Sequence, residues 1–158
     1  RNLQTPWIPV RFVSLIGLLL LACGVGESPY PSPAQTYGTY KDAVLGERPH
    51  EVWACFGAGY RQLEYEDSLE RWLAAWPVER ATRQEAVRRL QIQQEKLIND
   101  RIGFLRFDDS TVEADESPFF YFVQEEDGWK VTTHLDPAFR QALEQAVAEG
   151  EFRLPFAR

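Results

Sequence analysis

The spacing of hydrophobic residues changes once along this chain, and that change restricts the fold more than any other feature. Up to about residue 99, apolar side chains recur at the period of an α-helix. From Ile102 onwards they form short β-branched and aromatic runs separated by turn residues, a pattern typical of strands. Helices followed by neighbouring antiparallel strands indicate an α+β domain rather than alternating βαβ units.

Four helices are expected before the strands. Ser32 and Pro33 should begin the first, because serine is a good N-cap and proline is tolerated at the first helical position. Pro77 should end the third, and the capping box Thr82–Glu85 should open the fourth. The expected ranges are 33–45, 49–63, 67–76 and 82–99.

The strands should form an antiparallel meander, with a hairpin at Asp127-Gly128. Strands are expected over 102–107 and 119–123. A two-residue turn at Asp127-Gly128 would pair Glu125 with Lys130 and place Tyr121 opposite His134. A last helix should begin at Asp136-Pro137 and end before Gly150.

The N-terminal segment contains eleven uncharged residues, 12–22, preceded by Arg1 and Arg11. This length suits the apolar region of a signal peptide better than a membrane-spanning helix, which needs about 20 apolar residues. The positive charges before it predict that the domain lies outside the cytoplasm. Residues 24–33 read as a Pro/Ser-rich tether, residues 34–150 as one domain and residues 151–158 as a tail that can dock on the domain or on a partner.

The end of this segment, Leu20-Leu21-Ala22-Cys23-Gly24, resembles the lipobox of bacterial lipoproteins. The resemblance implies cleavage before Cys23 and attachment of a covalent diacylglycerol lipid to its thiol. Cys55 would then be a buried apolar residue. Two alternatives remain open: a retained single span over 7–26, and a Cys23–Cys55 disulfide.

The charge of the chain bears on its partners. After Gly26 there are 15 basic against 24 acidic residues, a balance of −9. Such a surface repels phosphate backbones, so nucleic acid is not expected as a partner. Membrane lipid, reached through the N-terminus, and a protein in a membrane complex are the expected partners.

The sequence contains no recognisable catalytic motif, and no catalytic, metal or cofactor residue is assigned. His50 is expected to be exposed in the first turn of a helix. His134 lies beside Asp136 and could act as a general base, although a hydrogen-bonded histidine at a strand end is the preferred interpretation. The acidic pairs are interpreted as turns or solvated edges: Asp108-Asp109, Asp115-Glu116 and Glu125-Glu126.

Residues Thr111–His134, which include the run Phe119–Val131, resemble the closing strands of NTF2-like domains, chiefly through Asp127-Gly128-Trp129-Lys130. The resemblance implies a sheet curled around helices to form a pocket for a small ligand. The nearest candidates for lining such a pocket are Trp72, Trp76, Tyr121 and His134.

Three functions are compatible with these features. The first is a non-enzymatic, membrane-anchored accessory subunit of a multi-subunit complex on the extracytoplasmic, periplasmic side. The second is an NTF2-like lipoprotein domain that binds or hydrolyses a small ligand, and the third is a chaperone-like assembly factor. A deep closed cavity containing His134 or acids would favour the second, whereas a filled core with an exposed apolar patch would favour the first.

Overall fold

Residues 27–153, the part of the chain that the computed structural model describes, have the predicted α+β order of helices, antiparallel strands and a closing helix. The helices are α1 (Pro33–Leu45), α2 (Pro49–Cys55), α3 (Ala58–Tyr65), α4 (Leu69–Arg89) and α5 (Pro137–Ala148). The strands are β1 (Ile92–Leu97), β2 (Ile102–Phe107), β3 (Phe119–Glu125) and β4 (Gly128–Thr132), and a 3-10 turn, η1 (Asp109–Thr111), follows β2. Neighbouring strands are antiparallel in the order β1-β2-β3-β4.

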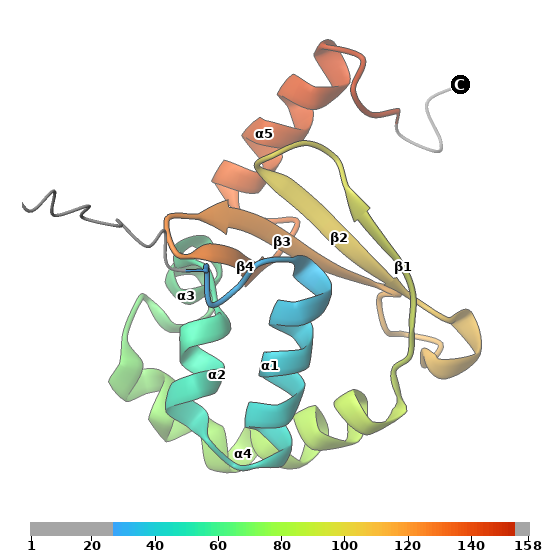
Figure 1. The fold of residues 1–158 in the computed structure, drawn as a ribbon. Helices are drawn as coiled ribbons and strands as arrows, with labels where there is room; N and C mark the ends of the chain where they lie inside the picture. Colours follow the sequence, from blue (N-terminus) through green and yellow to red (C-terminus); the bar gives the residue numbers. More distant parts are fainter. Residues whose placement is uncertain (1–26, 154–158) are drawn as a thin grey trace, which may run out of the picture.

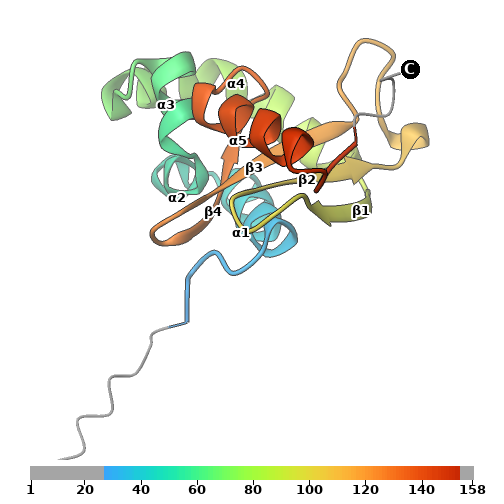
Figure 2. The same cartoon turned by 90° about the horizontal axis from the view of Figure 1, so that it is seen from above.

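The sheet has helices on both faces. Figures 1 and 2 show α1, α2 and α4 on one side of it and α5 alone on the other. Because successive strand residues point to opposite faces, β2 and β3 supply two cores. Leu105 and Phe122 pack with the N-terminal helices, whereas Ile102 and Tyr121 pack with Phe139 of α5.

The first and last helices begin where the sequence predicts. The Ser32 hydroxyl accepts a hydrogen bond from the Gln35 backbone N–H at 3.2 Å, and α1 ends before Gly46. The Asp136 carboxylate accepts from the Ala138 N–H at 2.9 Å and so caps α5. Both caps satisfy N–H groups that have no partner inside the helix.

The predicted helix over 49–63 is wrong, because the chain breaks into α2 and α3 at Phe56-Gly57. Here the backbone pairs with the outer edge of β4: Phe56 forms a parallel bridge with Val131, and the Gly57 N–H donates to the Val131 carbonyl at 2.8 Å. A Cβ at Gly57 would lie 3.2 Å from that carbonyl oxygen. The glycine therefore permits a close backbone approach.

The predicted boundary at Pro77 is also wrong, because α4 continues through it as a 21-residue helix. Proline removes one helical hydrogen bond. Trp72 and Trp76 before it and Val87 after it are all buried in the same core. Burial of both halves therefore offsets the lost bond, and the predicted cap at Thr82–Glu85 lies inside the helix.

The expected helix over 82–99 ends at Arg89, and residues Ile92–Leu97 form the edge strand β1. All six β1 side chains are exposed, so burial does not hold this segment in place. It pairs with β2 along its length, from Ile92 opposite Phe107 to Leu97 opposite Gly103. The backbone hydrogen bonds of the sheet outweigh the helical preference of this mostly polar segment.

The β3–β4 hairpin forms, but its register differs by two residues from the prediction. Glu125 pairs with Gly128 and Val123 with Lys130, so Glu126 and Asp127 form the tip. Only Gly128 takes a positive φ, +122°, whereas the predicted turn required one at Asp127 too. A two-residue shift leaves every side chain on its predicted face.

Residues within the predicted tether are docked on the hairpin. The Trp129 N–H donates to the Tyr30 carbonyl at 2.8 Å, and the Ser28 hydroxyl donates to the Asp127 carbonyl at 2.7 Å. The Lys130 ammonium lies 3.5 Å from the Tyr30 ring centroid. From Ser28 onwards the chain therefore packs on the domain. The lipobox, Cys23 and the last five residues of the tail lie outside the described residues.

Candidate binding site

The four residues predicted to line a pocket are not brought together. Trp72 and Trp76 are buried among the N-terminal helices. Tyr121 and His134 lie on the α5 side of the sheet, with ring centroids 5.9 Å apart. A single pocket lined by all four is therefore excluded.

His134 is exposed in the loop after β4, and its side chain does not pair with the Asp136 carboxylate, the arrangement that a general base would need. The buried Asp136 carboxylate instead accepts from the Thr132 hydroxyl at 2.6 Å and from the Ala138 backbone. Its two oxygens therefore stabilise the strand end and α5. His50 is exposed at the start of α2, as predicted.

The acidic pairs occupy turns and edges in the structure. Asp108 caps η1 by accepting from the Ser110 N–H at 2.9 Å, and it also accepts from the Ser110 hydroxyl at 2.7 Å. The hydroxyl bond is the main cause that lowers the pKa of this carboxyl, and the backbone bond adds to it. Asp109 pairs with Arg106 at 2.9 Å. Glu125 accepts from the Ala58 N–H at 2.7 Å, at the start of α3. These roles are structural.

Arg83 of α4 holds the densest polar cluster on the helical side of the sheet. Its Nη2 and Nε atoms lie 2.7 and 2.9 Å from Oε2 of Glu79, one helical turn away. It also donates to the hydroxyls of Tyr40 and Tyr65, both at 3.0 Å, and of Tyr60 at 3.3 Å. The guanidinium thus joins α1, α3 and α4.

Aromatic rings and burial fix the charge state of this cluster. The Arg83 guanidinium carbon lies 5.2 Å from the Trp72 ring centroid and 5.6 Å from that of Phe56. Burial disfavours the charged arginine, but the neighbouring tyrosines outweigh it and raise its pKa. Burial likewise raises the pKa of Tyr40 and Tyr65. Arg83 therefore stays charged and the phenols stay protonated.

A groove of about 290 Å³ lies beside this cluster, between α1, α4 and the sheet. We call it the Tyr37 groove. Its lining combines aromatic and aliphatic walls with a few polar groups: Tyr37, Tyr40, Thr82, Arg83, Ala86, Val87, Leu90, Phe107, Glu116, Ser117, Phe119 and Phe120. The Tyr37 side chain is only 4% exposed, and its hydroxyl has no hydrogen-bond partner among the described residues.

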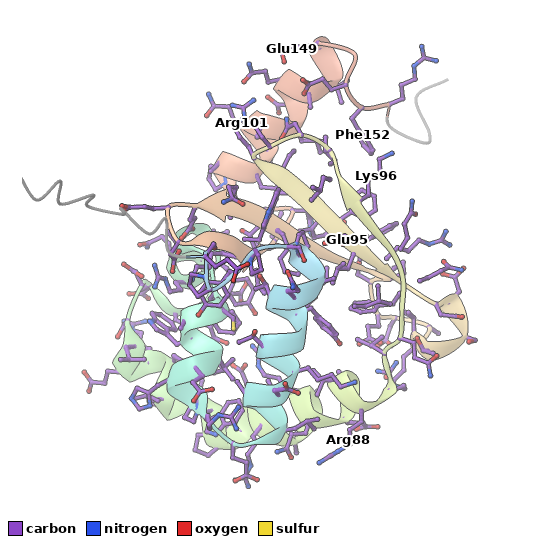
Figure 3. All side chains as sticks on the ribbon, viewed as in Figure 1. Arg88, Glu95, Lys96, Arg101, Glu149 and Phe152 are labelled. Carbon is purple, nitrogen blue, oxygen red and sulfur yellow. The ribbon has the colours of Figure 1, made fainter. Side chains whose placement is uncertain are left out.

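A second groove of about 210 Å³, the α5 groove, lies on the opposite face of the sheet. Its lining is apolar and mostly aromatic: Ile98, Phe104, Phe119, Tyr121, Phe139, Leu143 and Phe152. Phe152 reaches it from the tail after α5, and the Lys96 ammonium of β1 lies 5.7 Å from its ring centroid (Figure 3). The tail thus docks on the domain at Phe152.

Sequence reasoning missed Arg83 and the Tyr37 hydroxyl. Arg83 lies inside the capping box predicted at Thr82–Glu85, and the helical spacing of Tyr37 with Tyr40 and Val44 indicates only an apolar face. One signal was available: Glu79 and Arg83 stand four residues apart, following Trp72 and Trp76 on the same helix. A Glu–Arg pair that follows two tryptophans at helical spacing indicates a charged residue at the edge of the hydrophobic core.

No protein-family model, no curated protein and no solved structure matches this chain. Within residues 27–153, no helix is both long and apolar enough to cross a membrane. The same residues contain no cluster of three or more His, Cys, Asp or Glu side chains that could hold a metal ion.

Cys55 is fully buried, and burial raises the pKa of its thiol to about 12. At pH 8 the folded chain should therefore leave Cys55 unreactive towards iodoacetamide, because the thiolate is the nucleophile. A lipid thioether on Cys23 predicts no labelled cysteine in the native chain and one after unfolding, counted by intact mass. One labelled cysteine before unfolding and two after it would contradict lipidation.

Proposed function

We propose that this chain is a membrane-anchored, non-enzymatic binding domain that holds a protein partner on the extracytoplasmic side, as an accessory subunit of a membrane complex. The apolar segment 12–22 is removed by cleavage before Cys23, and the diacylglycerol lipid on Cys23 attaches the chain to the membrane. The α5 groove is its docking surface. The partner offers an apolar segment flanked by basic residues.

The composition of the α5 groove carries this proposal. Five of its seven lining residues are aromatic, and aromatic side chains are enriched at the centres of protein interfaces. The balance of −9 after Gly26 disfavours contact with anionic lipid headgroups. The same charge attracts a basic protein surface and speeds its association.

A matched pair of leucine substitutions tests the docking surface. Leu143→Gln changes a half-buried groove residue on α5, whereas Leu63→Gln changes an exposed residue on α3, outside the groove. Each full-length chain would be purified from native membranes in mild detergent, and its bound proteins quantified by mass spectrometry. We expect Leu143→Gln to reduce partner recovery about tenfold, as loss of a central apolar contact should, and Leu63→Gln to leave it unchanged.

Three results would overturn this proposal: wild-type chain that emerges without a partner, equal losses in both variants, or no loss in Leu143→Gln. Far-ultraviolet circular dichroism of both variants checks that the helices are retained. A partner segment that lacks basic residues would contradict the expected charge attraction but not docking at the α5 groove.

A second candidate function is small-ligand binding, the alternative that the NTF2-like resemblance implies. The unpaired Tyr37 hydroxyl at a groove favours it, because buried polar groups without a partner are rare in proteins. This candidate requires neither the membrane anchor nor the α5 groove.

A further inference from the structure

We propose that the Tyr37 groove binds an uncharged, mainly apolar small molecule that presents one hydrogen-bond acceptor, such as a ketone oxygen, to the Tyr37 hydroxyl. This inference rests on the second candidate function and is independent of the protein-docking role of the α5 groove. It follows from the missing hydrogen bond of the Tyr37 hydroxyl, from the paired charges at the groove and from its apolar lining.

The Tyr37 hydroxyl is held in place by rings rather than by polar groups. The Tyr37 ring centroid lies 5.3 Å from that of Phe107, 5.5 Å from that of Phe120 and 6.1 Å from that of Tyr40. Burying a hydroxyl without a hydrogen bond costs free energy that phenylalanine in the same position would not lose. A ligand that accepts this hydrogen bond would recover that free energy.

The two tyrosine hydroxyls at the groove, those of Tyr37 and Tyr40, each have a proton to donate. The Tyr40 hydroxyl accepts from Arg83, so its own proton is free to be donated. Burial raises the pKa of Tyr37, with smaller contributions from Tyr40 and Glu116, so this hydroxyl remains a donor at physiological pH. A ligand here must therefore supply an acceptor.

The charged groups at the groove are already balanced. Arg83 pairs with Glu79 at 2.7 Å, and Glu116 pairs with Arg89 at 2.9 Å. An anionic ligand would meet the Glu116 carboxylate, and a cationic one would meet the Arg83 guanidinium. An uncharged molecule avoids both costs.

The lining and the volume of the groove determine the shape and the size of the apolar part of the ligand. Leu90, Phe107 and Phe120 provide flat or branched apolar surfaces for a ring system. A volume of about 290 Å³ is at the lower end for ligand sites and suits a molecule of one or two rings.

Three bicyclic probes that differ only at the polar group test the proposal: 1-indanone, indane and 1-indanecarboxylate. Dissociation constants would be measured by protein-observed NMR titration of the full chain in detergent micelles, for wild type, Tyr37→Phe and Tyr121→Phe. Tyr121 lines the α5 groove on the other face of the sheet, so Tyr121→Phe shows whether the ketone preference comes from that groove instead of from Tyr37. Dissociation constants would use free probe concentrations corrected for partition of each probe into detergent, and ratios between variants then isolate the hydroxyl.

We expect wild type to bind 1-indanone about three- to tenfold more tightly than indane, the range that one neutral hydrogen bond supports. Tyr37→Phe should abolish that preference without weakening indane, and Tyr121→Phe should retain it. Equal binding of ketone and hydrocarbon to wild type, a preference that survives in Tyr37→Phe, or no binding of any probe would overturn the proposal. Tightest binding of the carboxylate would refute the uncharged class. None of these results depends on partner recovery in the Leu143→Gln test.

Discussion

Replacing Arg83 with alanine is expected to lower the free energy of unfolding by about 3 kcal/mol, because it leaves buried partners without their donor. Glu79 would lose both guanidinium hydrogen bonds, and the hydroxyls of Tyr40, Tyr60 and Tyr65 would each lose one. Glu79 is 34% exposed, so water compensates part of the loss. The expected value is therefore at the lower end for a broken buried ion pair.

A neighbouring arginine provides the control. Arg80 pairs with Glu47 at 3.0 Å, but both side chains are about half exposed, at 44% and 53%. Exposed ion pairs typically contribute less than about 1 kcal/mol, so Arg80→Ala should change stability little. Urea unfolding of the full chain, monitored by tryptophan fluorescence, would measure the free energy of unfolding of both variants. Trp72 and Trp76 are suitable reporters because they lie in the same core as the cluster.

The lysine variant separates charge from geometry. Lysine keeps the positive charge but cannot reach Glu79 and several hydroxyls with one planar fork of donors. Arg83→Lys should therefore fall between wild type and Arg83→Ala. Equal stability of Arg83→Ala and Arg80→Ala would show that the cluster contributes no more than a surface pair.

The parts of the fold that could be predicted from sequence depend on neighbours along the chain. Ser32 and Asp136 cap helices through side-chain bonds to backbone groups only two or three residues away. Such signals act locally, so they can be read without knowing the rest of the fold. The strand over 102–107 is equally local, because its apolar β-forming run leaves no helical alternative.

The parts that could not be predicted depend on residues far along the chain. Four of the six residues 92–97 are polar and the segment is helix-compatible, and only pairing with β2 makes it a strand. Gly57 interrupts a helical pattern because the backbone meets Val131, more than seventy residues later. The local sequence does not show which residue the Gly57 backbone meets or which strand pairs with 92–97, and tertiary contacts override local preference at both places.

The candidate site was hidden for the same reason. The partners of Arg83 come from three helices, and no spacing in the sequence brings Tyr40, Tyr60 and Tyr65 to one guanidinium. Tyr37 could be predicted to be buried, because it lies on the apolar stripe of its helix. That its hydroxyl lacks a partner follows only from what packs around it.

Substituting alanine for Gly128 is expected to destabilise the chain by about 3 kcal/mol, through backbone strain and steric overlap together. Gly128 has a φ of +122°, which side-chain-bearing residues rarely adopt. An added Cβ would also lie 2.3 Å from the Tyr30 carbonyl oxygen and 2.3 Å from the Ser28 hydroxyl oxygen. The variant must therefore release residues 28–30 from the hairpin or distort the turn.

Gly38 is the matched control for the same chemical change. It lies inside α1, and a Cβ there would meet nothing within 4 Å. Gly38→Ala should thus stabilise the chain by about 0.5–1 kcal/mol, the difference in helix propensity. In urea unfolding we expect Gly128→Ala to lower the free energy of unfolding and Gly38→Ala to raise it. Equal effects of the two substitutions would contradict the argument from backbone strain.

Release of residues 28–30 also has a consequence for any membrane attachment through Cys23. With Ser28 docked, at most four residues, 24–27, separate Cys23 from the domain, so Cys23 can lie at most about 18 Å from Ser28. Fluorescence energy transfer between a dye on the hairpin and labelled lipid should therefore decrease in Gly128→Ala if the segment detaches. Unchanged transfer with the expected loss of stability would show that the turn distorts while Tyr30 stays docked.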